Sequence, residues 1–273
     1  MAFLNDTDRG PQGRRELVGL AFASAPLILF LAIPFVALVA SISPAQWLHS
    51  VHSPDAISAL ALTLRTTLLS TVICIVGGLP VALLLGRHRF RGREFLDTLI
   101  DLPISVPPVV VGVALLMAFG RMGLIGKHFH AIGIDIGFTT AAVVLAQVVI
   151  ASPFFIKAAR AGIEGVDPRL ENAARVLGAN PWRVFWTVTF PLAKPGLLAG
   201  GLLAWARALS EFGATMMFAG NFPGRTQTLP LAVMSAFESD LSLSVGIATI
   251  SLILSVVALV GAKLIARSWR TAW

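Results

Sequence analysis

Long uncharged stretches alternate with short polar segments along the 273 residues of the chain. Charged residues bound five of these stretches, which lie at 17–48, 66–86, 102–120, 136–156 and 241–262. Most reach about 20 residues, the length that a helix needs to cross the hydrocarbon core of a bilayer. A sixth stretch, 195–224, is interrupted only by Arg207 and Glu211. The pattern therefore predicts an all-α integral membrane protein with six transmembrane helices.

Composition and charge placement agree with this pattern. Hydrophobic residues make up 56% of the chain and charged residues 13%, about half the charged fraction of an ordinary soluble domain. With a cytoplasmic amino terminus, 16 Lys and Arg residues fall in inner segments and 4 in outer ones. This bias orients membrane proteins, so we expect both termini in the cytoplasm. The net charge of +7 is then a topology signal and does not indicate nucleic-acid binding.

Prolines interrupt the third stretch. It opens with the sequence DLPISVPP at 101–108, in which we expect that Pro103, Pro107 and Pro108 cannot continue a regular helix, so that the backbone is bent or unwound. Irregular backbone at membrane depth is tolerated only where protein or a water-filled cavity surrounds it. The segment is therefore either part of a translocation pathway or a structural kink between packed helices.

A polar segment with helical periodicity, 164–191, separates two of the apolar stretches. Asp167 can cap a helix that begins at Pro168, and Gly178 can end it in a left-handed conformation. Between them, apolar residues recur at the spacing of one helical face, at Leu170, Ala173, Ala174 and Leu177. The spacing predicts a short helix with one apolar stripe.

A second short helix is expected directly after the first. Asn180 and Pro181 repeat the cap signal, and we expect this helix to end before Pro191. Trp182 and Trp186 suit the membrane–water interface. An amphipathic helix resting on lipid headgroups would explain the Trp and Arg residues of 164–191. It would not explain two cap signals around an Ala-Ala-x-x-x-Gly tip, which favours a docking site for a partner.

The sixth stretch carries two opposite charges four residues apart, Arg207 and Glu211. This spacing places them on one helical face, where they can pair. Either residue alone would be costly in hydrocarbon, so together they face protein or water. The residues themselves leave open whether this polar seam is functional or structural.

The tip of 164–191 resembles the cytoplasmic loop of binding-protein-dependent ABC importer permeases, whose pattern is E-A-A-x-x-x-G, nine residues, then I-x-L-P. Here Asn172 replaces the family Glu, with Glu171 beside it, and Val188 and Phe190 replace two apolar positions. In that family the loop is the coupling helix, which inserts into a groove on a separate ATP-hydrolysing subunit. The resemblance implies an ATPase-coupling set of Asp167, Pro168, Glu171, Asn172, Ala173, Ala174, Gly178, Pro181 and Pro191. No phosphate-binding loop G-x-x-x-x-G-K-[ST] occurs in the chain, so any ATP site lies on another chain.

The segments 204–221 and 225–240 resemble the molybdate permeases and their relatives for sulfate and tungstate. The resemblance implies a type I ABC importer permease fold, with a cytoplasmic tail at 1–16, one permease domain at 17–273 and a coupling loop at 159–191. It also implies a plasma-membrane protein (the inner membrane in a Gram-negative cell) that pairs with a second permease, an ATPase subunit and an extracytoplasmic binding protein. We expect no cofactor or metal on this chain.

The cargo of that family is a tetrahedral dianion, and the resemblance implies molybdate, with tungstate or sulfate as the alternatives. A dianion needs a hydrated path with hydrogen-bond donors, and binding must stay weak enough for release. Candidate pathway residues are Ser105, Arg207, Ser210, Glu211, Thr215 and Asn221.

Two other classes of function are weaker. An ion-coupled carrier could use Arg207 and Glu211 as a proton relay, but it would not need the segment 164–191. A membrane-embedded enzyme would need a motif such as H-E-x-x-H or G-x-S-x-G, and the chain contains neither.

Overall fold

The computed structural model describes residues 11–270, and it describes side chains from Gly19 onward except at 262–263 and 265–270. Most of the predicted tail at 1–16 therefore lies outside the described residues. The described chain is helical, with bounds α1 Pro11–Ala40, α2 Pro44–Val51, α3 Pro54–Arg87, α4 Arg93–Ser105, α5 Pro108–Phe119, α6 Gly126–Ala131, α7 Thr140–Glu164, α8 Pro168–Val176, α9 Pro181–Val184, π-helix η1 Phe185–Thr189, α10 Phe190–Leu209, α11 Gly213–Ala219, α12 Leu229–Ser239 and α13 Leu241–Arg270.

Five helical segments are long and apolar enough to cross a membrane. They lie in α1, α3, α7, the continuous run Pro181–Leu209, and α13. A sixth crossing forms if α4 and α5, which meet at a bend of 115°, count as one broken span. The prediction of an all-α protein with six spans is confirmed in this form.

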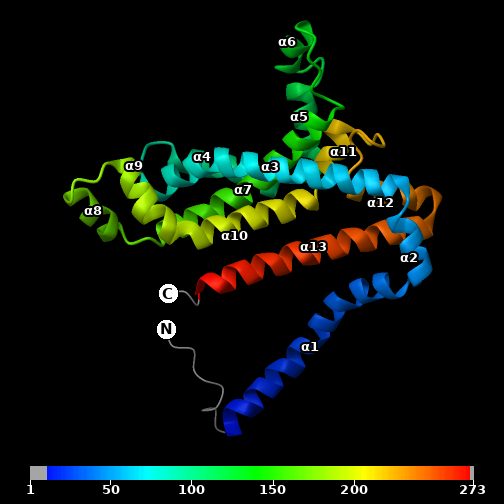
Figure 1. Cartoon of the computed structure of the whole chain (residues 1–273), viewed down its shortest axis with the longest axis horizontal. Helices are drawn as coiled ribbons and strands as arrows, with labels where there is room; N and C mark the ends of the chain where they lie inside the picture. The colour runs from blue at the N-terminus through cyan, green and yellow to red at the C-terminus, as the bar shows by residue number, and fades with distance from the viewer. Residues whose placement is uncertain (1–10, 271–273) are drawn as a thin grey trace.

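Helix α7 is the centre of the bundle. It packs along α3 on one side and α10 on the other, and α4 lies beside it (Figure 1). The core between these helices holds Phe155 and Ile163 of α7, Leu85 of α3 and Ala204 of α10, all buried. Helix α1 diverges from the bundle and contacts α13, while α5 and α6 project to the side (Figure 1).

One expectation about helix ends is wrong, and one stretch between the first two spans holds helices that the apolar pattern does not predict. Residues 43–63 contain α2 and the first turns of α3. Ser43 and Ser53 each cap a helix whose first residue is proline, a start signal that the apolar pattern alone does not reveal. The second helix of the polar segment does not end before Pro191, because η1 leads directly into α10.

The continuity at Pro191 has a local cause. The backbone N–H of Phe190 donates to the carbonyl of Phe185, five residues back, which is the wider turn of a π-helix. Pro191 follows in the first turn of α10. A proline is tolerated in a first turn because its missing N–H is not needed there.

Candidate functional site

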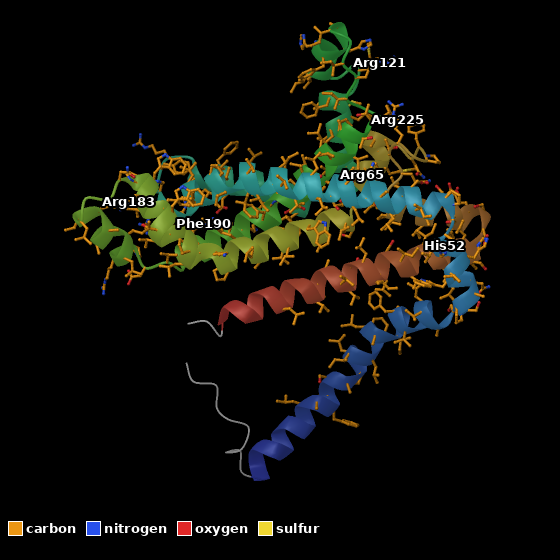
Figure 2. The ribbon with its side chains drawn as sticks, in the orientation of Figure 1. His52, Arg65, Arg121, Arg183, Phe190 and Arg225 are labelled. Carbon is orange, nitrogen blue, oxygen red and sulfur yellow. The ribbon has the colours of Figure 1, made fainter. Side chains whose placement is uncertain are left out.

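The loop between α7 and α10 stands at one end of the bundle, at the left of Figure 1, and we call this the loop end. Figure 2 shows Arg183 and Phe190 there, far from Arg121 and Arg225 on the projecting part of the molecule. Helix α7 continues to Glu164, so the first residues of the expected loop 159–191 extend the helix.

The capping signals form the predicted two-helix structure. The Asp167 carboxylate accepts a hydrogen bond from the Arg169 amide at 2.8 Å, and Pro168 begins α8. After α8 ends, Gly178 adopts φ +85°. The Asn180 side chain then accepts from the Arg183 amide at 2.8 Å, and Pro181 begins α9. The sequence thus sets both starts and the bend between them.

Helix α8 exposes its apolar face. Leu177 is 87% exposed, and Leu170, Ala173 and Val176 are exposed as well. Glu171, a carboxylate, points the other way and is only 5% exposed. A surface helix of a soluble protein has the opposite arrangement, with its apolar side inward. The outward face of α8 is therefore suited to contact another protein.

Glu171 is held by two partners from distant parts of the chain. Its Oε1 lies 2.9 Å from Nη2 of Arg87, at the end of α3, and accepts a hydrogen bond from the Thr189 hydroxyl at 2.6 Å. Arg87 also donates to the carbonyl of Val166 at 3.1 Å. Asn172, in the family's Glu position, faces outward and accepts from Arg175 at 3.2 Å. The neighbouring Glu171 therefore does not replace the family Glu on the outer face.

The two helices that carry the loop touch through their backbones. A Cβ on Gly162 of α7 would lie 2.8 Å from the Cα of Gly196 in α10, and one on Gly196 would lie 2.5 Å from the Cα of Gly162. Real Cβ atoms do not approach so closely, so only glycine fits at both positions. The two helices that flank the loop, α7 and α10, are therefore in direct backbone contact next to it.

The second region of interest lies where two breaks between consecutive helices are in contact, one within the broken span α4–α5 and one at the end of the span Pro181–Leu209. One break separates α4 from α5 at Val106 and Pro107, and the other separates α10 from α11 at 210–212. Pro103, which was expected to interrupt the helix as well, lies inside α4. A Cβ on Gly213 would lie 3.1 Å from the Val109 amide nitrogen, so the two breaks are in contact. This arrangement was not evident from the sequence.

The Arg207–Glu211 pair lies at the second break. Nη2 of Arg207 lies 3.0 Å from Oε2 of Glu211, which confirms the predicted pairing, although α10 ends between the two residues. Glu211 is 1% exposed, and its Oε1 accepts a hydrogen bond from the Ala214 amide at 2.7 Å. Ser210 is exposed, and its hydroxyl lies 3.4 Å from Nη1 of Arg207.

The remaining pathway candidates are dispersed. Ser105 is exposed at the end of α4, beside the first break. Thr215 of α11, a helix that packs on α5 and α7, is fully buried, and its hydroxyl has no hydrogen-bond partner. The Asn221 amide donates to Ser235 of α12 at 2.7 Å. The structure thus brings together Arg207, Ser210 and Glu211, places Ser105 at the adjacent break, and separates the other two.

Comparison with known proteins decides the family. The profile of the family described as "binding-protein-dependent transport system inner membrane component" matches residues 78–271. The "Molybdenum transport system permease protein ModB" of Mycobacterium tuberculosis is 41% identical over 234 residues, covering 86% of this chain and 89% of that protein. The chain belongs to this family.

Two further similarities extend this result. "Sulfate permease 2, chloroplastic" of Chlamydomonas reinhardtii is 39% identical over 228 residues, covering 82% of this chain and 61% of that protein. The crystal structure of a bacterial ABC transporter involved in alginate import has a TM-score of 0.73 at 16% identity, covering 93% of this chain and 96% of that one. The latter likeness shows that this permease has the fold of ABC importer membrane subunits.

One polar feature of the permease was missed in the sequence. Thr63, Thr66, Thr67 and Ser70 follow the helical spacing i, i+3, i+4, i+7 and form a buried stripe on α3. Gln147 of α7 donates to Thr66 at 3.2 Å and accepts from Ser70 at 2.9 Å, and Trp205 of α10 donates to Thr67 at 3.1 Å. The stripe joins the three central helices by hydrogen bonds. The i, i+3, i+4, i+7 spacing of these hydroxyl residues could have predicted the stripe from the sequence.

Outside the spans, Asp135 forms a small exposed cluster. Its carboxylate lies 2.8 Å from Nη2 of Arg121 and 2.9 Å from Nδ1 of His130. The hydrogen bond from Arg121, followed by its charge and the contact with His130, lowers the pKa of Asp135. Within residues 11–270 no group of three or more His, Cys, Asp or Glu side chains could hold a metal ion.

Proposed function

We propose that this chain is the permease subunit of an ATP-driven importer that carries molybdate into the cytoplasm. The observation that carries the proposal is the outward apolar face of α8, built on the loop motif of its family. The molybdenum transport permease that is 41% identical over most of the chain supports the choice of cargo.

Helix α8 acts as the coupling helix. ATP is hydrolysed by a separate subunit, since this chain carries no phosphate-binding loop. The exposed Leu170, Ala173 and Leu177 supply an apolar surface for a groove on that ATPase. In this orientation the loop end faces the cytoplasm, and the 16-to-4 charge bias supports it.

The adjacent breaks form part of the anion pathway. Backbone groups at a helix break cannot face lipid, so this region borders either protein or water. Arg207 offers a positive charge and is itself partly exposed, Ser210 is exposed beside it, and Ser105 is exposed at the neighbouring break. Donors of this kind stabilise a passing dianion without enclosing it, which permits release.

Two permease copies form the membrane unit, and an extracytoplasmic binding protein delivers the anion. The complex lies in the plasma membrane, and the outer surface of α1 is available to lipid or to the second copy, since its hydrophobic side chains are exposed. This chain binds no cofactor of its own in the proposed mechanism.

Reconstitution of the whole complex tests the proposal. The permease, its ATPase and its binding protein are placed in proteoliposomes, and ATP hydrolysis and uptake are measured with molybdate, tungstate and sulfate. We expect molybdate to stimulate both at the lowest concentration. Uptake without ATP that collapses with the proton gradient would instead support an ion-coupled carrier.

Sulfate is the second candidate cargo, and the relative named as a sulfate permease favours it. Sulfate, tungstate and molybdate share charge and shape, so the permease residues do not separate them. Stimulation by sulfate at concentrations where molybdate has no effect would decide for this alternative.

A further inference from the structure

The buried contacts of Glu171 connect three separate segments. Arg87 ends α3, Glu171 lies in the middle of α8, and Thr189 is the last residue of η1. We call these three residues the Glu171 network. The ion pair spans 84 positions of sequence and the hydroxyl contact spans 18. A single carboxylate thus joins α8 both to a membrane-spanning helix and to the start of α10.

Helix α8 has little other attachment to α3. Within the described residues its main helix contacts are with α9 and η1, and it has none of comparable extent with α3. A cleft of about 890 Å³ lies between these segments, lined by Leu83 and Arg87 of α3 and by Glu171, Trp182 and Thr189. The guanidinium of Arg87 therefore bridges a gap that the backbones do not close.

The Glu171 network is an inefficient way to stabilise the fold, because burying its two charges costs free energy of desolvation. Its side chains are 17% exposed for Arg87 and 7% for Glu171, so both charges have lost most of their water. An apolar pair of similar volume often gives equal or greater stability at such a site. The charged pair fixes the orientation of α8 relative to α3, because hydrogen bonds restrict the angle between the groups that they join.

We propose that Arg87, Glu171 and Thr189 are positioning residues that fix α8 to α3 and η1, so that a displacement of α8 moves the membrane spans. The inference rests on the proposed function, in which an ATPase displaces α8. Without the network, α8 still binds the ATPase through its outer face. Its movement is then absorbed in the cleft instead of reaching α3.

A double substitution tests this while protecting the fold. Arg87→Met with Glu171→Leu removes both charges together, so no unpaired charge is left buried. The matched control is Asp97→Asn, which weakens the ion pair of Asp97 with Arg160 between α4 and α7 and does not touch α8. All variants are studied as the full complex with ATPase and binding protein.

Transport per ATP is the first readout. We expect the double variant to keep its ATPase and to hydrolyse ATP, while uptake per ATP falls roughly tenfold, within the usual range of coupling energies. Asp97→Asn should keep the wild-type ratio, and Thr189→Val should lie between the two. A wild-type ratio in the double variant would overturn the proposal, as would a loss of uptake that only follows loss of bound ATPase.

Spin labels provide a readout that does not depend on the cargo. In a Cys74→Ala background, labels at Arg169 of α8 and Leu84 of α3, both exposed, report the distance between the two helices. We expect one narrow distribution with and without ATP in the wild type, and a broad or ATP-dependent one in the double variant. Identical distributions would contradict the network's role. A wild-type complex that shows the narrow distribution but carries no molybdate would refute the proposed cargo alone.

Discussion

Glu171 and Glu211 are two buried carboxylates, each paired with an arginine, at opposite parts of the permease. Glu211 takes its partner from four residues away, and it also accepts a hydrogen bond from the Ala214 amide in the first turn of α11. Glu171 takes its partner from 84 residues away and accepts a further hydroxyl from η1. The first pair lies at the break between the consecutive helices α10 and α11, whereas the second pair joins segments that are far apart in the sequence. A buried carboxylate–arginine pair therefore stabilises a local helix break at Glu211, whereas at Glu171 it connects helices that are distant in sequence.

The largest effect is expected from removing one half of the local pair. Glu211→Ala leaves the Arg207 guanidinium without its counter-charge inside a span and removes the hydrogen-bond acceptor of the Ala214 amide. Unpairing a buried ion pair usually destabilises a protein by about 3–5 kcal/mol. The thermal midpoint of the purified complex should fall accordingly, and Glu238→Gln, at an exposed site on α12, serves as the control. A midpoint equal to that of the control would mean that Glu211 is hydrated in the native complex.

Removing both halves separates stability from transport. Arg207→Met with Glu211→Leu leaves no unpaired charge, so we expect the thermal midpoint to recover most of the loss seen in Glu211→Ala. Molybdate uptake should nevertheless fall by roughly tenfold or more, because the proposed pathway has lost its positive group. ATPase binding should be unaffected, since α8 is intact. Uptake at the wild-type rate would show that the Arg207–Glu211 pair is purely structural.

The outer face of α8 is tested by two matched glycines. Gly178 and Gly92 both have positive φ, at 85° and 91°, and both have open space where a Cβ would be. Tryptophan at either position causes similar backbone strain, on the order of 1–2 kcal/mol. Only Gly178→Trp should block co-purification of the ATPase while the protein stays in the membrane. Equal ATPase recovery from Gly178→Trp and Gly92→Trp would argue against docking at α8.

The smallest effect is expected at Asp135, an exposed carboxylate that is also paired with an arginine. Because Arg121 lowers its pKa, the group favours the folded state above the ordinary Asp value near 3.8 and loses this contribution as pH falls through the lowered value. Thermal midpoints of wild type and Asp135→Asn should therefore show the same pH dependence from pH 7 to 5. They should converge only below about pH 4. Convergence already near pH 6 would contradict the lowered pKa.

The sequence predicted those features that depend on neighbours along the chain. The spans follow from apolar length, the starts of α8 and α9 from Asp167-Pro168 and Asn180-Pro181, and the Arg207–Glu211 pair from its spacing. The family and the coupling motif followed from resemblance. The starts of α2 and α3 were also readable from Ser-Pro pairs but were missed.

Features that depend on packing between distant segments could not be predicted from the sequence. Nothing near Glu171 indicates that Arg87 will meet it, because the ion pair exists only once α3 and α8 are placed side by side. The contact of Gly213 with the other break likewise depends on how α5 and α11 pack. The π-helix before Pro191 could not be inferred, since a proline after an apolar run more often indicates a helix end.

Cross-linking to the ATPase tests the central claim most directly. In a Cys74→Ala background, a cysteine at Leu177 on the exposed face of α8 is compared with a cysteine at Val184, a buried residue of α9, in the complete complex. A short bifunctional reagent should join the first variant to the ATPase subunit in high yield and leave the second unlinked. Absence of any link from Leu177→Cys in a complex that still imports its anion with ATP would contradict the assignment of α8 as the coupling helix.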